Sequence, residues 1–90
     1  MSTSLKNGSI TTGGTAQDAL PERLGRTTVV VQAQDEDMFV NFGTNAAIDT
    51  GYMIPVRAEV RFEVWKFPEV GGRVSIISPS TGAKYEIQDI

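Results

Sequence analysis

The stretch that decides the fold is residues 58–65, which read AEVRFEVW. In this stretch Val60, Phe62 and Val64 alternate with charged residues. Successive side chains of a β-strand point to opposite faces, so the alternation predicts a strand with one apolar face and one charged face. The same apolar residues placed at a helical period would be scattered around the cylinder. Residues 58–65 are therefore predicted to form a strand that buries one face.

Further strands are predicted on both sides of this stretch, because runs of β-branched and aromatic residues are separated by turn-forming residues. These strands cover residues 27–34, 38–42, 52–55, 73–78 and 83–89, with a weaker strand signal at residues 10–12. Strands that follow one another are predicted to pair as hairpins, one across the acidic triplet Asp35–Asp37 and one at the C-terminus across residues 80–82. Residues 43–51 are small, polar and bounded by glycine, which predicts a loop, and Pro55 makes residues 52–55 an edge strand.

This pattern predicts an all-β fold, a small antiparallel β-sandwich or barrel of six to seven short strands. The residues expected to form the core are Val29, Val31, Val40, Phe42, Val60, Phe62, Val64, Val74, Ile76, Tyr85 and Ile87. Which of Met38 and Phe39 points inward depends on the register, and both possibilities stay open.

The N-terminal nine residues, MSTSLKNGS, are polar and small. They predict a flexible arm, or an extended segment that orders only against a partner. The chain is thus divided into an arm over residues 1–9 and a β-sandwich domain over residues 10–90. The doublets Gly13–Gly14 and Gly71–Gly72 are interpreted as bends, because a phosphate-binding loop would need a following helix with a lysine and a hydroxyl at fixed spacing.

Composition excludes several classes of function. The 90 residues contain eleven acidic and eight basic residues, which gives a net charge of −3, and the bases are scattered along the chain. Nucleic-acid binding is disfavoured because it normally needs a basic face. The apolar runs are far shorter than the roughly 20 residues of a membrane span, and residues 1–10 lack the apolar region of a signal peptide. The product is expected to stay in the compartment where it is made.

The absence of both histidine and cysteine bears on chemistry and on stability. No imidazole base, thiolate nucleophile or ordinary zinc site can be built, so no enzyme, metal or cofactor is expected. Clustered carboxylates such as Asp35–Asp37 can in principle hold calcium, but the spacing of a calcium loop is missing and a solvated turn is favoured. Glu59 and Glu63 are interpreted as a solvated strand face around Arg61. A domain this small, without disulfide or metal, is expected to gain stability by forming a homo-oligomer.

One aromatic segment falls outside this reasoning about the core. Trp65 and Phe67 stand in the sequence WKFP, and alternation puts Trp65 on the charged face of its strand. A wide aromatic side chain on a polar face favours contact with a partner subunit. The other interpretation, that Trp65 covers the end of its own core, stays open.

Several short pieces of the chain together suggest a family. They are ITTGGTAQ at residues 10–17, Arg26 before a β-branched strand, VVVQAQDEDMFVNFG at residues 29–43 and PEVGGRVSIISPSTGAKYEI at residues 68–87. In this order they resemble a family of small bacteriophage virion proteins. One departure is the asparagine-serine turn expected after the first long strand, which is replaced here by Ala33, Gln34 and the acidic triplet.

The resemblance implies a non-enzymatic structural protein of the virion, made in the host cytoplasm. Its role would be capsid decoration or a head fibre, as a symmetric oligomer with a trimer as the first guess, in contact with the major capsid protein or other virion proteins. The candidate partner contacts are Trp65, Phe67, Gly13, Gly14 and Gln17. Alternatives are a tail or head-tail accessory protein, and a small carbohydrate-binding β module that uses Trp65, Phe67 and Tyr52 as aromatic platforms. A small enzyme is disfavoured because neither histidine nor cysteine is present.

Overall fold

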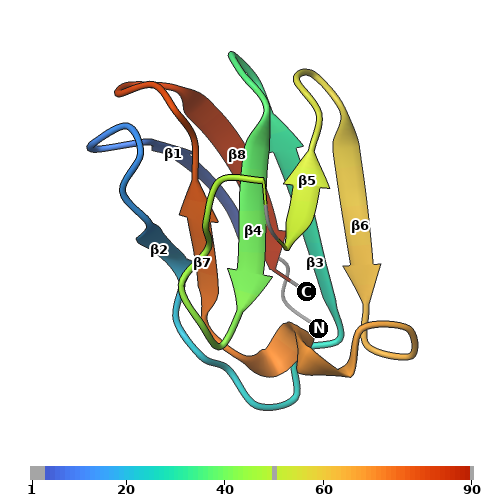
Figure 1. Ribbon diagram of the computed structural model, residues 1–90. Helices are drawn as coiled ribbons and strands as arrows, with labels where there is room; N and C mark the ends of the chain where they lie inside the picture. Colours follow the sequence, from blue (N-terminus) through green and yellow to red (C-terminus); the bar gives the residue numbers. More distant parts are fainter. Residues whose placement is uncertain (1–3, 50, 90) are drawn as a thin grey trace.

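The structure is a computed structural model that describes residues 4–49 and 51–89. Eight strands form two four-stranded antiparallel sheets that pack face to face (Figure 1). The first sheet has the order β1 (Ser4–Ser9), β8 (Lys84–Asp89), β3 (Thr28–Ala33) and β6 (Glu59–Glu63). The second sheet has the order β2 (Gln17–Leu20), β7 (Val74–Ile77), β4 (Met38–Phe42) and β5 (Tyr52–Ile54), and the 3-10 turn η1 (Pro68–Gly71) leads into β7. The prediction of an all-β sandwich is confirmed. The described residues include no helix long and apolar enough to cross a membrane.

The strands pair in a nested order. β1 pairs with β8, β2 with β7, β3 with β6 and β4 with β5, all antiparallel. Every connection except the one between β4 and β5 crosses from one sheet to the other. Eight strands nested in this way over two sheets form a jelly roll.

Both predicted hairpins are wrong. The strands on either side of Asp35–Asp37, β3 and β4, lie in different sheets, and so do β7 and β8. The physical reason is that both edges of β3 are already occupied, by β6 on one side and β8 on the other. The acidic turn instead connects one sheet to the other, and its carboxylates hold neighbouring segments. Asp35 Oδ2 accepts a hydrogen bond from the N–H of Lys84 at 2.9 Å, and Asp37 Oδ1 accepts one from the N–H of Val56 at 2.7 Å.

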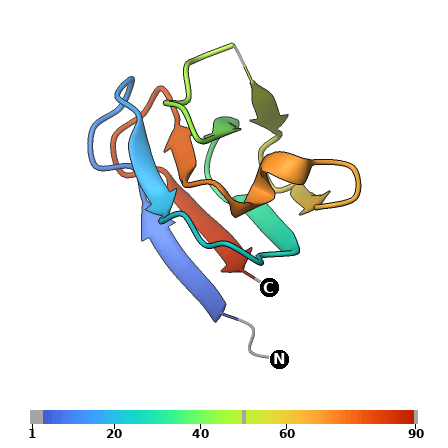
Figure 2. The ribbon, with the colours of Figure 1, turned by 90° about the horizontal axis from the view of Figure 1, so that it is seen from below.

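The N-terminal segment belongs to the first sheet. β1 pairs with β8 without interruption from Ser4 opposite Asp89 to Ser9 opposite Lys84, and the two strands lie side by side in Figure 2. A flexible arm is therefore wrong for residues 4–9, and residues 1–3 lie outside the described residues. Sheet pairing uses the backbone, so a small, polar segment can form a strand. The strand signal at residues 10–12 is also misplaced, because the chain turns there and β2 begins at Gln17.

The core lies between the two sheets and follows the predicted alternation for nine of the eleven residues. Val60 is only partly buried, and Val64 is wrong as a core residue because it is 41% exposed. The cause is that β6 ends at Glu63, where the N–H groups of both Lys66 and Phe67 bond to the carbonyl of Glu63 and turn the chain.

The register of β4 decides the open question about its first two residues. Met38 points into the main core, whereas Phe39 lies on the outer face of the second sheet in a small cluster with Ile77 and Ala46. The predicted loop at residues 43–51 is confirmed for the described residues 43–49 and 51, and its Ala46 and Ile48 pack at this cluster. The N–H of Ala46 donates to the hydroxyl of the buried Ser75 at 3.0 Å, which holds the loop against the sheet.

Candidate interaction surface

The glycine doublet of the GGTAQ segment packs against the turn between β7 and β8. The N–H of Gly13 donates to Thr81 Oγ1 at 2.8 Å, and the N–H of Gly14 donates to the carbonyl of Ser78 at 2.8 Å. A Cβ at position 13 would lie 2.3 Å from the carbonyl oxygen of Pro79, so only glycine fits there. Gly14 has a φ of +77°, a conformation that glycine adopts at little cost. Gly13 and Gly14 are predicted partner contacts, but their backbone N–H groups form hydrogen bonds within the chain.

Gln17 is also engaged internally. Its Oε1 accepts a hydrogen bond from the N–H of Thr11 at 2.7 Å, and its Nε2 donates to the carbonyl of Ser9 at 2.9 Å. Its side chain also hydrogen-bonds Tyr85, whose pKa is raised because burial disfavours the phenolate. Gln17 thus ties the end of β1 to the start of β2 and to the core side of β8.

Phe67 belongs to an aromatic cluster that closes the open side of the sandwich. Its ring packs edge-to-face against Tyr52 at 5.2 Å and against Phe62 at 5.1 Å between centroids. Both Phe67 and Tyr52 pack against the main core and are only partly exposed. Both rings are thus partly engaged in contacts within the chain.

Among the candidate contacts that have a side chain, Trp65 is the most exposed, with 76% of its area accessible, whereas Gln17 and Phe67 are partly buried. Its Nε1–H donates to Glu63 Oε2 at 3.0 Å, and Arg61 Nε contacts Glu63 Oε1 at 3.2 Å. The hydrogen bond from Trp65 and the interaction with Arg61 lower the pKa of Glu63. The ionised carboxylate of Glu63 is therefore the hydrogen-bond acceptor for the exposed indole.

A hollow of about 320 Å³ lies beside this indole, around β6. Its lining combines apolar and charged groups, namely Val60, Arg61, Glu63, Trp65, Lys66 and Phe67. β6 is the last strand of its sheet, so its outer edge has no strand partner among the described residues. Tryptophan and arginine are the residue types most enriched among the side chains that dominate binding energy at protein interfaces. This hollow, called here the Trp65 hollow, is the candidate surface for a protein partner.

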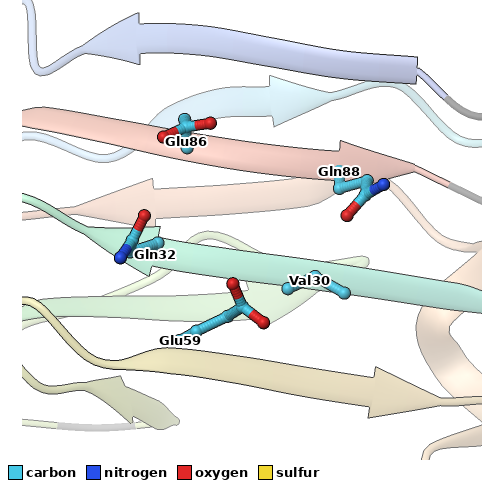
Figure 3. A pocket seen from close by; sticks show the side chains of 5 residues that line it. All are labelled: Val30, Gln32, Glu59, Glu86 and Gln88. Atoms are coloured by element: carbon cyan, nitrogen blue, oxygen red, sulfur yellow. The ribbon is translucent and has the colours of Figure 1, made fainter.

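A second hollow lies on the outer face of the first sheet. Its volume is about 220 Å³, and it is lined by Val30, Gln32, Glu59, Glu86 and Gln88 (Figure 3). Sequence reasoning missed this group because its members come from β3, β6 and β8, which meet only through long-range pairing. The one signal in the sequence is that the apolar Val30 occupies a position of β3 on the outer face of the sheet, where polar residues are expected.

The described residues contain no group of three or more acidic side chains arranged to hold a metal ion. Two carboxylates of the acidic triplet accept backbone hydrogen bonds, as described above, and act as loop anchors. Glu59 and Glu63 both occupy the outer face of β6, and Glu63 is paired with Arg61 between them.

Comparison with known proteins leaves the family open. No family model matches the chain, and no curated protein or solved structure matches it. The function is therefore argued from the fold, from the contacts made by the family-like pieces and from the two hollows.

Proposed function

We propose that the protein is a non-enzymatic structural component of a bacteriophage particle, a capsid decoration or head-fibre subunit that assembles as a symmetric oligomer. One observation carries the proposal. The separate pieces of sequence that resemble small virion proteins contact one another within the fold. Contacts of this kind are what a shared family fold would require.

The pieces meet at both ends of the sandwich. At one end, the N–H of Gly82 donates to the carbonyl of Ile10 at 2.7 Å and the N–H of Ile10 donates to the carbonyl of Ala83 at 2.8 Å, which joins the piece at residues 10–17 to the piece at residues 68–87. At the other end, the buried Arg26 donates to the carbonyls of Val70 and Gly72, both at 3.0 Å, which joins the isolated arginine to the PEVGG piece. The pieces that carry the resemblance are thus joined to one another in the fold.

The architecture supports the same proposal at the level of analogy. Jelly rolls recur in viral capsid proteins, although they also occur in lectins and cupins. A fold by itself does not determine a function, so the contacts between the family-like pieces carry more weight than the topology.

The Trp65 hollow supplies the partner contact in this proposal. The hydrogen bond to Glu63 favours one orientation of the exposed indole, which lowers the conformational cost of ordering it at an interface. The partner would be another copy of the chain or a shell protein, and a 90-residue domain without disulfide or metal gains stability from either. A protein in the tail or at the head-tail junction would use the same surface, but the particle would carry a different number of copies of it.

The proposal is tested by complementing a phage that lacks this gene with variants of the chain. Trp65→Ala is expected to reduce the particle-bound fraction at least tenfold, while Leu24→Ala, which removes an equally exposed apolar side chain (89% exposed) elsewhere, leaves it unchanged. Circular dichroism checks that both variants fold. Equal incorporation of Trp65→Ala and the unaltered chain would contradict the proposal that Trp65 contacts the partner.

Oligomerisation is tested on the purified chain. Sedimentation at micromolar concentration is expected to give a multiple of 9.7 kDa. A folded monomer whose melting temperature does not depend on concentration would contradict the oligomer.

A further inference from the structure

The hollow on the outer face of the first sheet has a regular construction. Glu86, Gln32 and Glu59 lie opposite one another on the neighbouring strands β8, β3 and β6. The next outward position of β3 is Val30, which lies opposite Gln88 on one side and Arg61 on the other. The hollow exists because Val30 is short and its neighbours are long, and Figure 3 shows the four polar side chains around it.

The polar groups around this hollow have unused hydrogen-bonding capacity. Within the described part of the chain, the side chains of Gln32, Gln88 and Glu59 receive no hydrogen bond or ion pair from the protein. Glu86 accepts one hydrogen bond, from Gln34 Nε2 at 2.8 Å, which fixes its orientation and leaves acceptor positions free. Neither carboxylate takes part in a salt bridge among the described residues. Val30, only 6% exposed, forms the apolar floor.

The donors and acceptors present define the class of ligand. The two amide groups offer N–H donors and carbonyl acceptors, and the two carboxylates offer acceptors only. An anion would be repelled by the carboxylates, and a cation would leave the amide donors unused. A hydroxyl group both donates and accepts, so a ring that carries several hydroxyls can satisfy every group.

We propose that this hollow, formed by Val30, Gln32, Glu59, Glu86 and Gln88, binds a neutral carbohydrate. The C–H face of a sugar ring lies on Val30, and its hydroxyls bond to the amides and carboxylates. A volume of about 220 Å³ is below the roughly 300–1,000 Å³ of pockets for drug-sized ligands, which suits one sugar ring. Neighbouring strands are about 4.8 Å apart, so the sheet holds the polar groups at fixed spacing.

This inference goes beyond the proposed function and does not depend on it. The hollow around Val30 and the Trp65 hollow share no lining residue, although β6 contributes residues to both. It also differs from a platform built on aromatic rings, since Tyr52 and Phe67 are packed into the aromatic cluster. Without a stacking aromatic, binding of a single ring is expected in the millimolar range.

The test is a titration of the ¹⁵N-labelled full chain with the methyl pyranosides of glucose, galactose and mannose. At least one sugar is expected to shift the side-chain NH₂ resonances of Gln32 and Gln88 in a saturable way. Glu59→Ala and Gln88→Ala should each weaken that sugar at least fivefold. Glu22→Ala removes an exposed acidic side chain that does not line the hollow, and it should leave binding unchanged.

Three results would overturn the inference. They are no saturable shift with any of the sugars, an unchanged response in both Glu59→Ala and Gln88→Ala, or an equal response to argininamide, which would assign the hollow to a cation. Backbone amide spectra of the variants check that the fold is kept. Because the titration uses the purified chain alone, its failure would leave the proposal about the virion untouched.

Discussion

Arg26 offers the sharpest test of how the lower end of the sandwich is held together. Its side chain is 2% exposed, and its Nε contacts Asp89 Oδ1 at 2.7 Å. Its Nη2 donates to the carbonyl of Pro21 at 2.7 Å, and its Nη1 donates to the carbonyls of Val70 in η1 and of Gly72 just after η1. Arg26→Met keeps much of the side-chain volume and removes all of these bonds, which leaves a largely buried carboxylate and three carbonyls without their donor.

The expected loss follows from those partners. Removal of one member of a buried ion pair costs about 3–5 kcal/mol, and each buried acceptor left without a donor costs about 1–3 kcal/mol. Arg23 still pairs with Asp89 Oδ2 at 2.8 Å and is itself half-exposed, which places the loss at the lower end. We expect Arg26→Met to lower the free energy of unfolding by about 3 kcal/mol. Proteins of 90 residues typically have about 5–13 kcal/mol in total, so the loss is a large fraction of it.

The assay is urea unfolding at pH 7, followed by circular dichroism at one fixed protein concentration, because the proposed oligomer would make stability depend on concentration. The matched control is Arg73→Met, which breaks the exposed contacts of Arg73 with Asp18 and Asn45 and should cost no more than about 1 kcal/mol. Equal losses for the two variants would refute the assignment of Arg26 as a buried structural anchor.

Three further predictions follow from the packing. Phe62→Ala should cost about 3–5 kcal/mol in urea unfolding because it empties the centre of the aromatic cluster, whereas Val64→Ala should cost no more than about 0.5 kcal/mol; the reverse order would mean that the end of β6 is misassigned. The indole Nε1–H resonance of Trp65 should shift with a midpoint below pH 4.5 as Glu63 gains its proton. The reason is that the pKa of Glu63 is lowered in the folded chain, so the hydrogen bond is lost as the pH falls through that pKa. A midpoint at or above pH 4.5 would argue against the hydrogen bond. Deletion of residues 1–9 should lower the melting temperature, because β8 loses six paired residues; an unchanged value would return this segment to the role of a flexible arm.

The positions of the strands could be predicted from the sequence, but their partners could not. Alternation around Phe62 and the β-branched run at Val29–Val31 mark strands because burial of one face imposes a period of two. Pairing between neighbours in the sequence was the wrong assumption, since three of the four nested pairs join strands that are far apart in the chain. β1 was missed because its residues carry almost no apolar pattern, and Gly8 is needed there for the ring of Tyr85, which depends on tertiary packing.

The candidate surface could be predicted in part. Alternation along residues 58–65 leaves two roles open for Trp65, a partner contact or a cover for its own core, and the structure exposes it in the turn after β6. Gly13 and Gln17 were marked for the same role, but their contacts within the chain depend on the turn at residues 78–81, which no local pattern reveals. The hollow around Val30 could not be predicted at all, because its lining comes together only when β3 lies between β6 and β8.

The central claim, that the chain is a structural part of a phage particle, is tested most directly by the amount of it in purified particles. Quantitative mass spectrometry of gradient-purified particles would measure its copy number relative to the major shell protein. The account predicts a fixed ratio that is the same across preparations, and a high ratio would favour the head over the tail. Absence of the chain from particles, while it is abundant in the infected-cell lysate, would contradict the claim.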